Sequence, residues 1–155
     1  MTVLSTEKIL PQPRDKLWEI VAHFDQAVRW VDGVEKVEHV SGEAANLGGV
    51  WRVYLRWGGS YQIIDIEITE WIQGERFGLR PLSPASADDD VELYQIVFNL
   101  KALTDSQTQV TVQCEYKPRN SLAKIKNLAF LRRQYLQRVE ASFEALGRVV
   151  NEQAF

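Results

Sequence analysis

The chain has 155 residues, of which 45% are hydrophobic and 25% charged, and its formal net charge is −3. This composition is typical of a soluble globular domain and argues against disorder, collagen and coiled coils. The single cysteine excludes an internal disulfide framework, and two histidines with one cysteine cannot complete a four-ligand His/Cys zinc site. The length predicts one domain over residues 1–155.

Charge and apolar runs limit the partners that we expect. Residues 1–9 lack the basic and apolar regions of a signal peptide, and no apolar run approaches the ~20 residues of a membrane span, so we expect a cytoplasmic protein. The net charge is too small to favour nucleic acid. Residues 117–148 carry eight basic and two acidic residues, which is typical of a solvated helix face. An anionic ligand head or a peripheral membrane contact is the alternative.

A strand and two short helices are predicted first. Thr2–Leu10 forms the strand, and Pro13 suits the first turn of the helix that follows. Apolar residues at helical spacing then predict helices over Arg14–Phe24 and Asp25–Gly33.

From Val34 the hydrophobic period changes to two, and turn signals such as Gly58-Gly59 separate six further strands. These strands are predicted at Val34–Val40, Val50–Trp57, Tyr61–Trp71, Arg76–Leu82, Val91–Leu103 and Gln109–Tyr116. Residues 83–90 hold a proline and three consecutive aspartates and predict an exposed loop. Successive strands of this kind favour an antiparallel sheet.

One long helix ends the chain. Ser121 is a credible N-cap, and Leu122–Val150 contains no proline and no glycine before Gly147. At ~1.5 Å per residue such a helix is roughly 44 Å long. No other predicted element is large enough to cover the apolar face of the sheet, so the fold class is α+β.

Several short segments occur in an order that resembles the START-like helix-grip superfamily, also called SRPBCC, which includes polyketide cyclases/dehydrases and lipid-transport proteins. The segments are Pro13-Arg14-Asp15-Lys16-Leu17-Trp18, Asp25 to Trp30, Leu47-Gly48-Gly49-Val50-Trp51-Arg52-Val53, Ile68-Thr69-Glu70-Trp71 with Arg76-Phe77, Phe98-Asn99-Leu100, Thr108-Gln109-Val110-Thr111-Val112 and Phe143-Glu144-Ala145-Leu146-Gly147-Arg148. The resemblance covers nearly the whole chain. It implies a helix-grip fold, in which a curved antiparallel sheet of about seven strands wraps around the C-terminal helix.

The resemblance also implies a deep pocket between sheet and long helix. In the superfamily this pocket binds lipids, sterols, plant hormones or polyketides. If the protein binds or carries such a molecule, as we expect, it requires no metal or cofactor. Its mouth would lie among the loops Trp57–Ser60, Pro81–Asp90 and Lys117–Ser121.

The alternation within Val50–Trp57 predicts which side chains face that pocket. Trp51, Val53 and Leu55 should point inward, and Arg52 and Arg56 outward with Tyr54. The opposite pleat would place two arginines inside and favour an enzyme. Tyr94, Ile96, Phe98 and Leu100 are expected to share one face of their strand. The candidate ligand-binding residues are Trp51, Val53, Leu55, Trp57, Ile64, Ile66, Tyr94, Phe98, Tyr116, Leu128, Arg132, Leu136 and Val139. For the apolar residues an ordinary core position is the alternative, and for Tyr94 and Tyr116 the alternative is a hydroxyl bonded to backbone groups.

Arg132 stands out on the long helix. At 100° per residue it falls at the centre of an apolar stripe made by Ile125, Ala129, Leu136, Val139, Phe143, Leu146 and Val150. A buried unpaired charge is costly, so Arg132 should pair with a carboxylate, reach the solvent at the pocket mouth, or hold an anionic ligand.

Other chemistry-bearing residues are less informative. Cys114 continues an apolar strand face and is expected to be an inert core thiol. His23 and His39 join no nucleophile and base that we can identify. Phe130 lies on the polar side of the helix, as would suit a dimer or membrane contact, and whether the protein is a monomer or homodimer stays open.

The leading functional hypothesis is therefore binding or transport of a hydrophobic small molecule, with or without an anionic head. A polyketide cyclase or dehydratase that uses the same pocket is the first alternative. A protein-interaction regulator that acts through the basic helix is the second.

Overall fold

The structure, a computed structural model, describes residues 2–57, 60–82, 91–118 and 122–153. Its elements, in chain order, are β1 (Thr2–Leu10), α1 (Arg14–Val21), the 3-10 turn η1 (Phe24–Gln26), α2 (Ala27–Trp30), β2 (Val34–Ser41), β3 (Val50–Trp57), β4 (Ser60–Ile72), β5 (Arg76–Pro81), β6 (Val91–Thr104), β7 (Gln107–Pro118) and α3 (Leu122–Glu152). The predicted order of a strand, two short helices, further strands and one long helix is confirmed.

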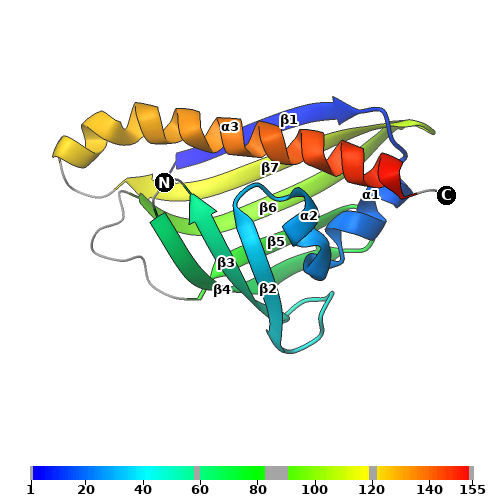
Figure 1. Cartoon of the computed structure of the whole chain (residues 1–155), viewed down its shortest axis with the longest axis horizontal. Helices are drawn as coiled ribbons and strands as arrows, with labels where there is room; N and C mark the ends of the chain where they lie inside the picture. Colours follow the sequence, from blue (N-terminus) through cyan, green and yellow to red (C-terminus); the bar gives the residue numbers. More distant parts are fainter. Residues whose placement is uncertain (1, 58–59, 83–90, 119–121, 154–155) are drawn as a thin grey trace.

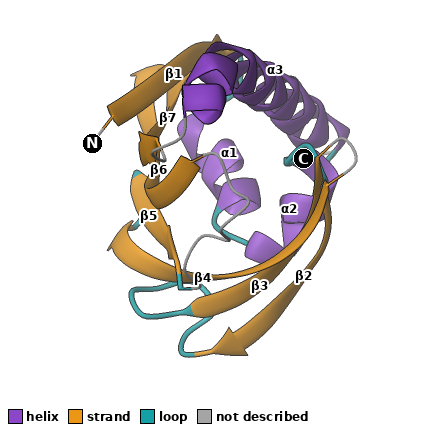
Figure 2. Ribbon diagram, turned by 90° about the vertical axis from the view of Figure 1, so that its left-hand side faces the viewer, coloured by secondary structure: helices purple, strands orange, loops and turns teal. Residues whose placement is uncertain are grey.

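The described strands form a seven-stranded sheet in the order β1-β7-β6-β5-β4-β3-β2, and every neighbouring pair is antiparallel. Figure 1 shows α3 running along β1 and β7. In Figure 2 the sheet curves around α1 and α2, and α3 lies across the opening of the curve. The fold is thus the predicted α+β helix-grip arrangement.

The bounds of β1 and β3 match the predicted ones, and α3 is continuous over 31 residues. The first helix, in contrast, ends at Val21 rather than at Phe24. His23 is extended, with φ −96° and ψ 92°, and this break turns Phe24 into the core. The apolar spacing was right for Phe24 burial but wrong for its secondary structure, because an irregular turn can bury a residue as a helix does.

The main core lies where α1, η1 and the C-terminal half of α3 meet the sheet. Aromatic rings from five elements pack there: the ring centroid of Phe77 on β5 lies 5.1 Å from that of Phe24 on η1 and 5.3 Å from that of Phe98 on β6. Trp18 packs edge-on against Trp71 at 5.2 Å. Apolar burial of this density is the main stabilising contribution to the domain.

Polar contacts attach the helices to one another at that end of the molecule. Arg138 on α3 forms an ion pair with Asp32, which follows α2, at 2.9 Å. The backbone N–H of Asp32 donates to the Ser142 hydroxyl at 2.9 Å, and that hydroxyl donates to the Arg138 carbonyl. The position of α3 relative to α2 is therefore set by directional contacts as well as by packing.

Candidate functional site

The inner face of the sheet is the face that meets the helices. Trp51 on β3 lies opposite Ile66 on β4, and Val53 lies opposite Ile64. Trp51 is buried, with its ring 5.7 Å from that of Phe24. The predicted inward pleat of Trp51, Val53 and Leu55 is confirmed, since residues two apart on a strand share a face.

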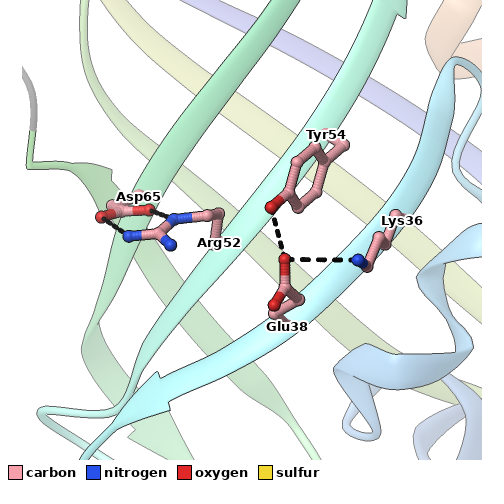
Figure 3. A network of polar contacts seen from close by, with 5 residues as sticks. All are labelled: Lys36, Glu38, Arg52, Tyr54 and Asp65. Carbon is pink, nitrogen blue, oxygen red and sulfur yellow. Dashed lines mark hydrogen bonds and ion pairs between the residues drawn. The ribbon is translucent and has the colours of Figure 1, made fainter.

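The outer face of the same strands carries the charged residues. Arg52 bonds Asp65 at 2.9 Å, and Arg56 bonds Glu35 at 2.8 Å, with each of these four side chains between 29% and 53% exposed. Figure 3 shows the Arg52–Asp65 pair on β3 and β4. Both arginines therefore point away from the helices, as the alternation predicted.

Tyr54 completes this outer network. Its hydroxyl donates to Glu38, whose carboxylate also pairs with Lys36 at 3.6 Å (Figure 3). The hydrogen bond raises the pKa of Tyr54 and lowers that of Glu38. Such exposed, internally paired charges support the strands only weakly.

Burial changes along the inner face. Towards the core, Ile68, Leu100 and Val110 are fully buried. Next to the core and beyond it, a set of apolar residues that spans five neighbouring strands is only partly buried, and Ile66, Leu79 and Val112 of this set pack against the core. We call this set the inner apolar patch; it consists of Val53, Leu55, Ile64, Ile66, Leu79, Ile96 and Val112.

The stripe on α3 follows the same gradient. Phe143 and Leu146 are fully buried, whereas Leu136 and Val139 are half-buried. Arg132, one turn earlier on the stripe, is exposed. Of the three outcomes expected for Arg132, this exposure fits the one in which its side chain reaches the solvent, because the cover given by the sheet and short helices declines towards this part of α3. Its role towards an anionic ligand stays a prediction.

The aromatic candidate residues on β6 and β7 do not lie together in one site. Phe98 is 3% exposed and stacks on Phe77, so it belongs to the closed core. A register shift at Leu93 and Gln95 places Leu93 opposite Tyr116. Tyr94 donates to Glu92 at 3.3 Å, on the outer face. The prediction that Tyr94 shares a face with Ile96 is wrong, because the bulge inserts one residue.

Some predicted residues lie outside the described part of the chain. These are the side chains of Trp57, Leu128 and Phe130, the loop at 83–90, the cap at Ser121, and most of the three predicted mouth loops.

Cys114 and Tyr135 form a polar pair within this apolar region. Cys114 lies on the inner face of β7, opposite Leu4 and Ile96, and is 6% exposed. Its side chain is hydrogen-bonded to Tyr135 of α3, and burial raises its pKa to about 11. Burial and the Cys114 contact raise the pKa of Tyr135 as well, so both groups are neutral at physiological pH. The predicted core location of Cys114 is confirmed.

Sequence reasoning missed Tyr135, although a signal was present. Tyr135 precedes Val139 by four residues and therefore lies beside it on the helix. Arg132, three residues earlier, is charged and therefore gave the stronger signal on this part of the helix.

A shallow groove of about 470 Å³ lies on the other side of α3, against β1. At its base the Gln12 amide donates to the Gly147 carbonyl at 3.4 Å and to Asn151 at 3.3 Å. At one side Lys8 pairs with Glu140. These contacts hold α3 against the start of the chain.

The described residues contain neither a metal-binding cluster nor a membrane-spanning helix. Across 2–57, 60–82, 91–118 and 122–153, no cluster of three or more His, Cys, Asp or Glu side chains could hold a metal ion. No helix in this part of the chain is both long enough and apolar enough to cross a membrane.

No protein-family model and no curated protein sequence matches the chain. Solved structures do. The Zhui aromatase/cyclase from Streptomyces sp. R1128 is 15% identical with a TM-score of 0.80, covering 98% of this chain and 94% of that one. A START superfamily protein from Mycobacterium smegmatis is 11% identical with a TM-score of 0.75, covering 98% and 99%.

Norcoclaurine synthase from Thalictrum flavum, in complex with dopamine and hydroxybenzaldehyde, is 12% identical with a TM-score of 0.74, covering 99% of this chain and 88% of that one. At such low identities these likenesses show the fold. The predicted resemblance to the START-like helix-grip superfamily is confirmed at that level.

Proposed function

We propose that this protein binds a hydrophobic small molecule against the inner apolar patch, between the sheet and α3. The observation that supports the proposal is the gradient of burial along one continuous apolar face. Ile68 is fully buried, while Ile64, on the same face of the same strand, stays partly exposed. Apolar surface left uncovered inside a curved sheet is typical of a ligand site.

The fold neighbours support the class of ligand only coarsely. Their names include an aromatase/cyclase and a synthase crystallised with two aromatic small molecules. One fold hosts many functions, so these names give a class of small apolar or aromatic compounds and no particular one.

The charge distribution favours binding over the cyclase alternative. Arg52 and Arg56, which an opposite pleat would have placed inside, are paired with carboxylates on the outer face. Acid–base chemistry on a bound chain needs a titratable group within hydrogen-bonding reach of the reacting atoms. The polar pair described above has its pKa values shifted away from neutrality.

Two neighbouring isoleucines provide a matched test. Ile64 belongs to the inner apolar patch, whereas Ile63 faces outward and is 54% exposed. Binding of the neutral fluorescent probe N-phenyl-1-naphthylamine is measured for wild type, Ile64→Trp and Ile63→Trp. Filling the patch should weaken binding at least ~10-fold, because the indole of the new residue would occupy the space against the patch that the probe needs. Ile63→Trp should bind as wild type does.

Absence of saturable binding by wild type would contradict the proposal. So would equal effects of the two substitutions, since they differ only in the face that they occupy. Thermal melting of each variant checks that the protein is folded.

A further inference from the structure

The groove between β1 and α3, which run side by side in Figure 1, contains a buried polar group whose hydrogen bonds are incomplete. Gln12 is 4% exposed and lines this groove and an adjoining hollow of about 260 Å³. Its Nε2 donates to the Gly147 carbonyl and to Asn151 Oδ1, at the long distances of 3.4 and 3.3 Å. Its Oε1 is buried and accepts no hydrogen bond from any described residue. A buried acceptor without a donor is destabilising, so this oxygen favours a further partner.

The geometry of the carboxamide fixes what that partner must supply. The Gly147 carbonyl can only accept, so the amide atom that faces it is the nitrogen of Gln12. The last side-chain torsion of glutamine is broad, and two long hydrogen bonds restrain it weakly, so the amide can turn Oε1 towards the groove. A ligand that meets Gln12 there must bring an N–H or O–H donor.

Gly147 is a second, independent observation at the same place. It lies inside α3, five residues before the helix ends at Glu152, where glycine is a poor helix former. A Cβ built on Gly147 would lie 3.4 Å from Gln12 Nε2 and 3.5 Å from Oε1, which are ordinary van der Waals distances. The φ of Gly147 is not positive, so neither packing nor backbone conformation requires a glycine. The missing side chain does leave room beside the carboxamide, in a groove that Gly147 also lines.

The charged side chains around the groove favour a cation over an anion. Lys8 bonds Glu140 closely and lies 3.9 Å from Glu144. Arg148 and Glu152 are also 3.9 Å apart, near the limit of an ion pair. Glu144 and Glu152 are 68% and 59% exposed, so each carboxylate can turn to a cation without losing a close partner. These five residues carry three negative and two positive charges, and an anion would also face the unpaired oxygen in the floor.

We propose that this groove is a second binding site, separate from the inner apolar patch, for a small primary amine in its ammonium form. An ammonium group has three N–H donors, one for Gln12 Oε1 and the others for the carboxylates at the rim. Leu10, Pro11 and Phe143 form the apolar part of the lining, so the ligand carries a short hydrocarbon body. The proposal does not depend on the proposed function, because the two sites lie on different sides of α3.

Three cyclohexyl compounds test this chemistry: cyclohexylmethylamine, its N,N,N-trimethyl ammonium derivative and cyclohexanecarboxylate. Each is titrated at pH 7.5 and constant salt into the ¹⁵N-labelled protein, and binding is followed by the backbone amide shifts of residues 147–151. The amine should bind saturably. The trimethyl derivative keeps the charge but has no N–H, so it should bind at least ~10-fold more weakly, as the loss of one charge-assisted hydrogen bond gives. The carboxylate should give no saturable shift.

Gly147→Ala is the sharpest variant, because its expected effects on stability and binding are opposite. Alanine should maintain or raise the melting temperature, since it is the better helix former and its Cβ meets no clash. It should weaken binding of cyclohexylmethylamine at least ~5-fold, because the methyl group occupies the room beside Oε1. Gln12→Met keeps the length of the side chain, removes the acceptor and should weaken binding at least ~10-fold. Gln113→Met is the matched control: it removes an exposed glutamine amide from β7 and should bind as wild type does.

Several results would overturn the proposal. Equal affinity for the amine and its trimethyl derivative would mean that no N–H is recognised, and tighter binding of the carboxylate would reverse the expected charge. A lower melting temperature of Gly147→Ala would show that packing accounts for the glycine. Unchanged binding by a stable Gly147→Ala protein would show that the room beside Gln12 is not used. Displacement of N-phenyl-1-naphthylamine by the amine would place it in the inner apolar patch, which leaves the proposed function standing and removes the second site.

Discussion

Three isoleucines on β4 allow the gradient of burial on the inner face to be measured. Ile68 is fully buried, Ile64 is half-buried on the same face, and Ile63 is 54% exposed on the opposite face. Each is changed to alanine, which removes the same three carbons. At about 0.8 kcal/mol per buried carbon the transfer contribution is roughly 2.4 kcal/mol when burial is complete.

The three sites should differ in the free energy of unfolding. Ile68→Ala should cost about 3–5 kcal/mol, because a cavity adds to the transfer contribution in a core that cannot collapse. Ile64→Ala should cost about 1–2 kcal/mol, since its surroundings already leave surface uncovered. Ile63→Ala should stay within about 0.5 kcal/mol, and it also reports the change in strand propensity common to all three.

Urea unfolding followed by tryptophan fluorescence gives these values, with the slope compared among variants to confirm a common two-state transition. Equal costs for Ile64→Ala and Ile68→Ala would refute the reasoning. They would mean that the inner apolar patch is closed core, and the main support for a ligand site there would be lost.

Other features of the structure predict further measurable effects. A Cβ on Gly49 would lie 2.0 Å from the Glu43 carbonyl oxygen, so Gly49→Ala should lower the melting temperature by more than ~5 °C; an unchanged melt would contradict this close approach. The double-mutant cycle of Arg52→Gln with Asp65→Asn should give a coupling of at most about 1 kcal/mol, because both side chains are partly exposed, and a larger value would show a stronger pair. The pKa of Cys114 rises from 9.0 to about 11, so Ellman's reagent at pH 8 should label the native thiol at least ~100-fold more slowly than the urea-unfolded one; similar rates would contradict its burial. The same shift makes the neutral thiol stabilising below pH ~9, a contribution that is lost as the pH rises towards 11.

Much of the fold could be predicted because each element repeats one period over many residues. The alternation in Val50–Trp57 gave both the bounds of β3 and the direction of its side chains. The absence of proline in Leu122–Val150 predicted one continuous helix. Long periodic segments carry many independent signals for one structure, so a single irregular residue does not change the prediction.

Local irregularities could not be predicted in the same way. The extended residue His23 ends α1 early, and the bulge next to Gln95 turns Tyr94 outward. In both places one residue departs from the regular backbone while the hydrophobic pattern around it continues. A period-two or period-3.6 pattern has no feature that marks such a residue, because tertiary packing selects it.

Arg132 shows that the face of a helix on which a residue lies does not determine how deeply that residue is buried. Arg132, Leu136 and Val139 lie on the same stripe of α3, as the 100° rotation per residue requires. Burial nevertheless falls from Phe143 to Arg132, because it depends on what covers each turn. The cost of burying a guanidinium, which made Arg132 look functional, is therefore not incurred. The phenol of Tyr135, three residues further along α3, does enter the covered region, where it meets the buried thiol of Cys114. The position of the cover, rather than the sequence of the stripe, therefore decides how deeply each residue of the stripe is buried.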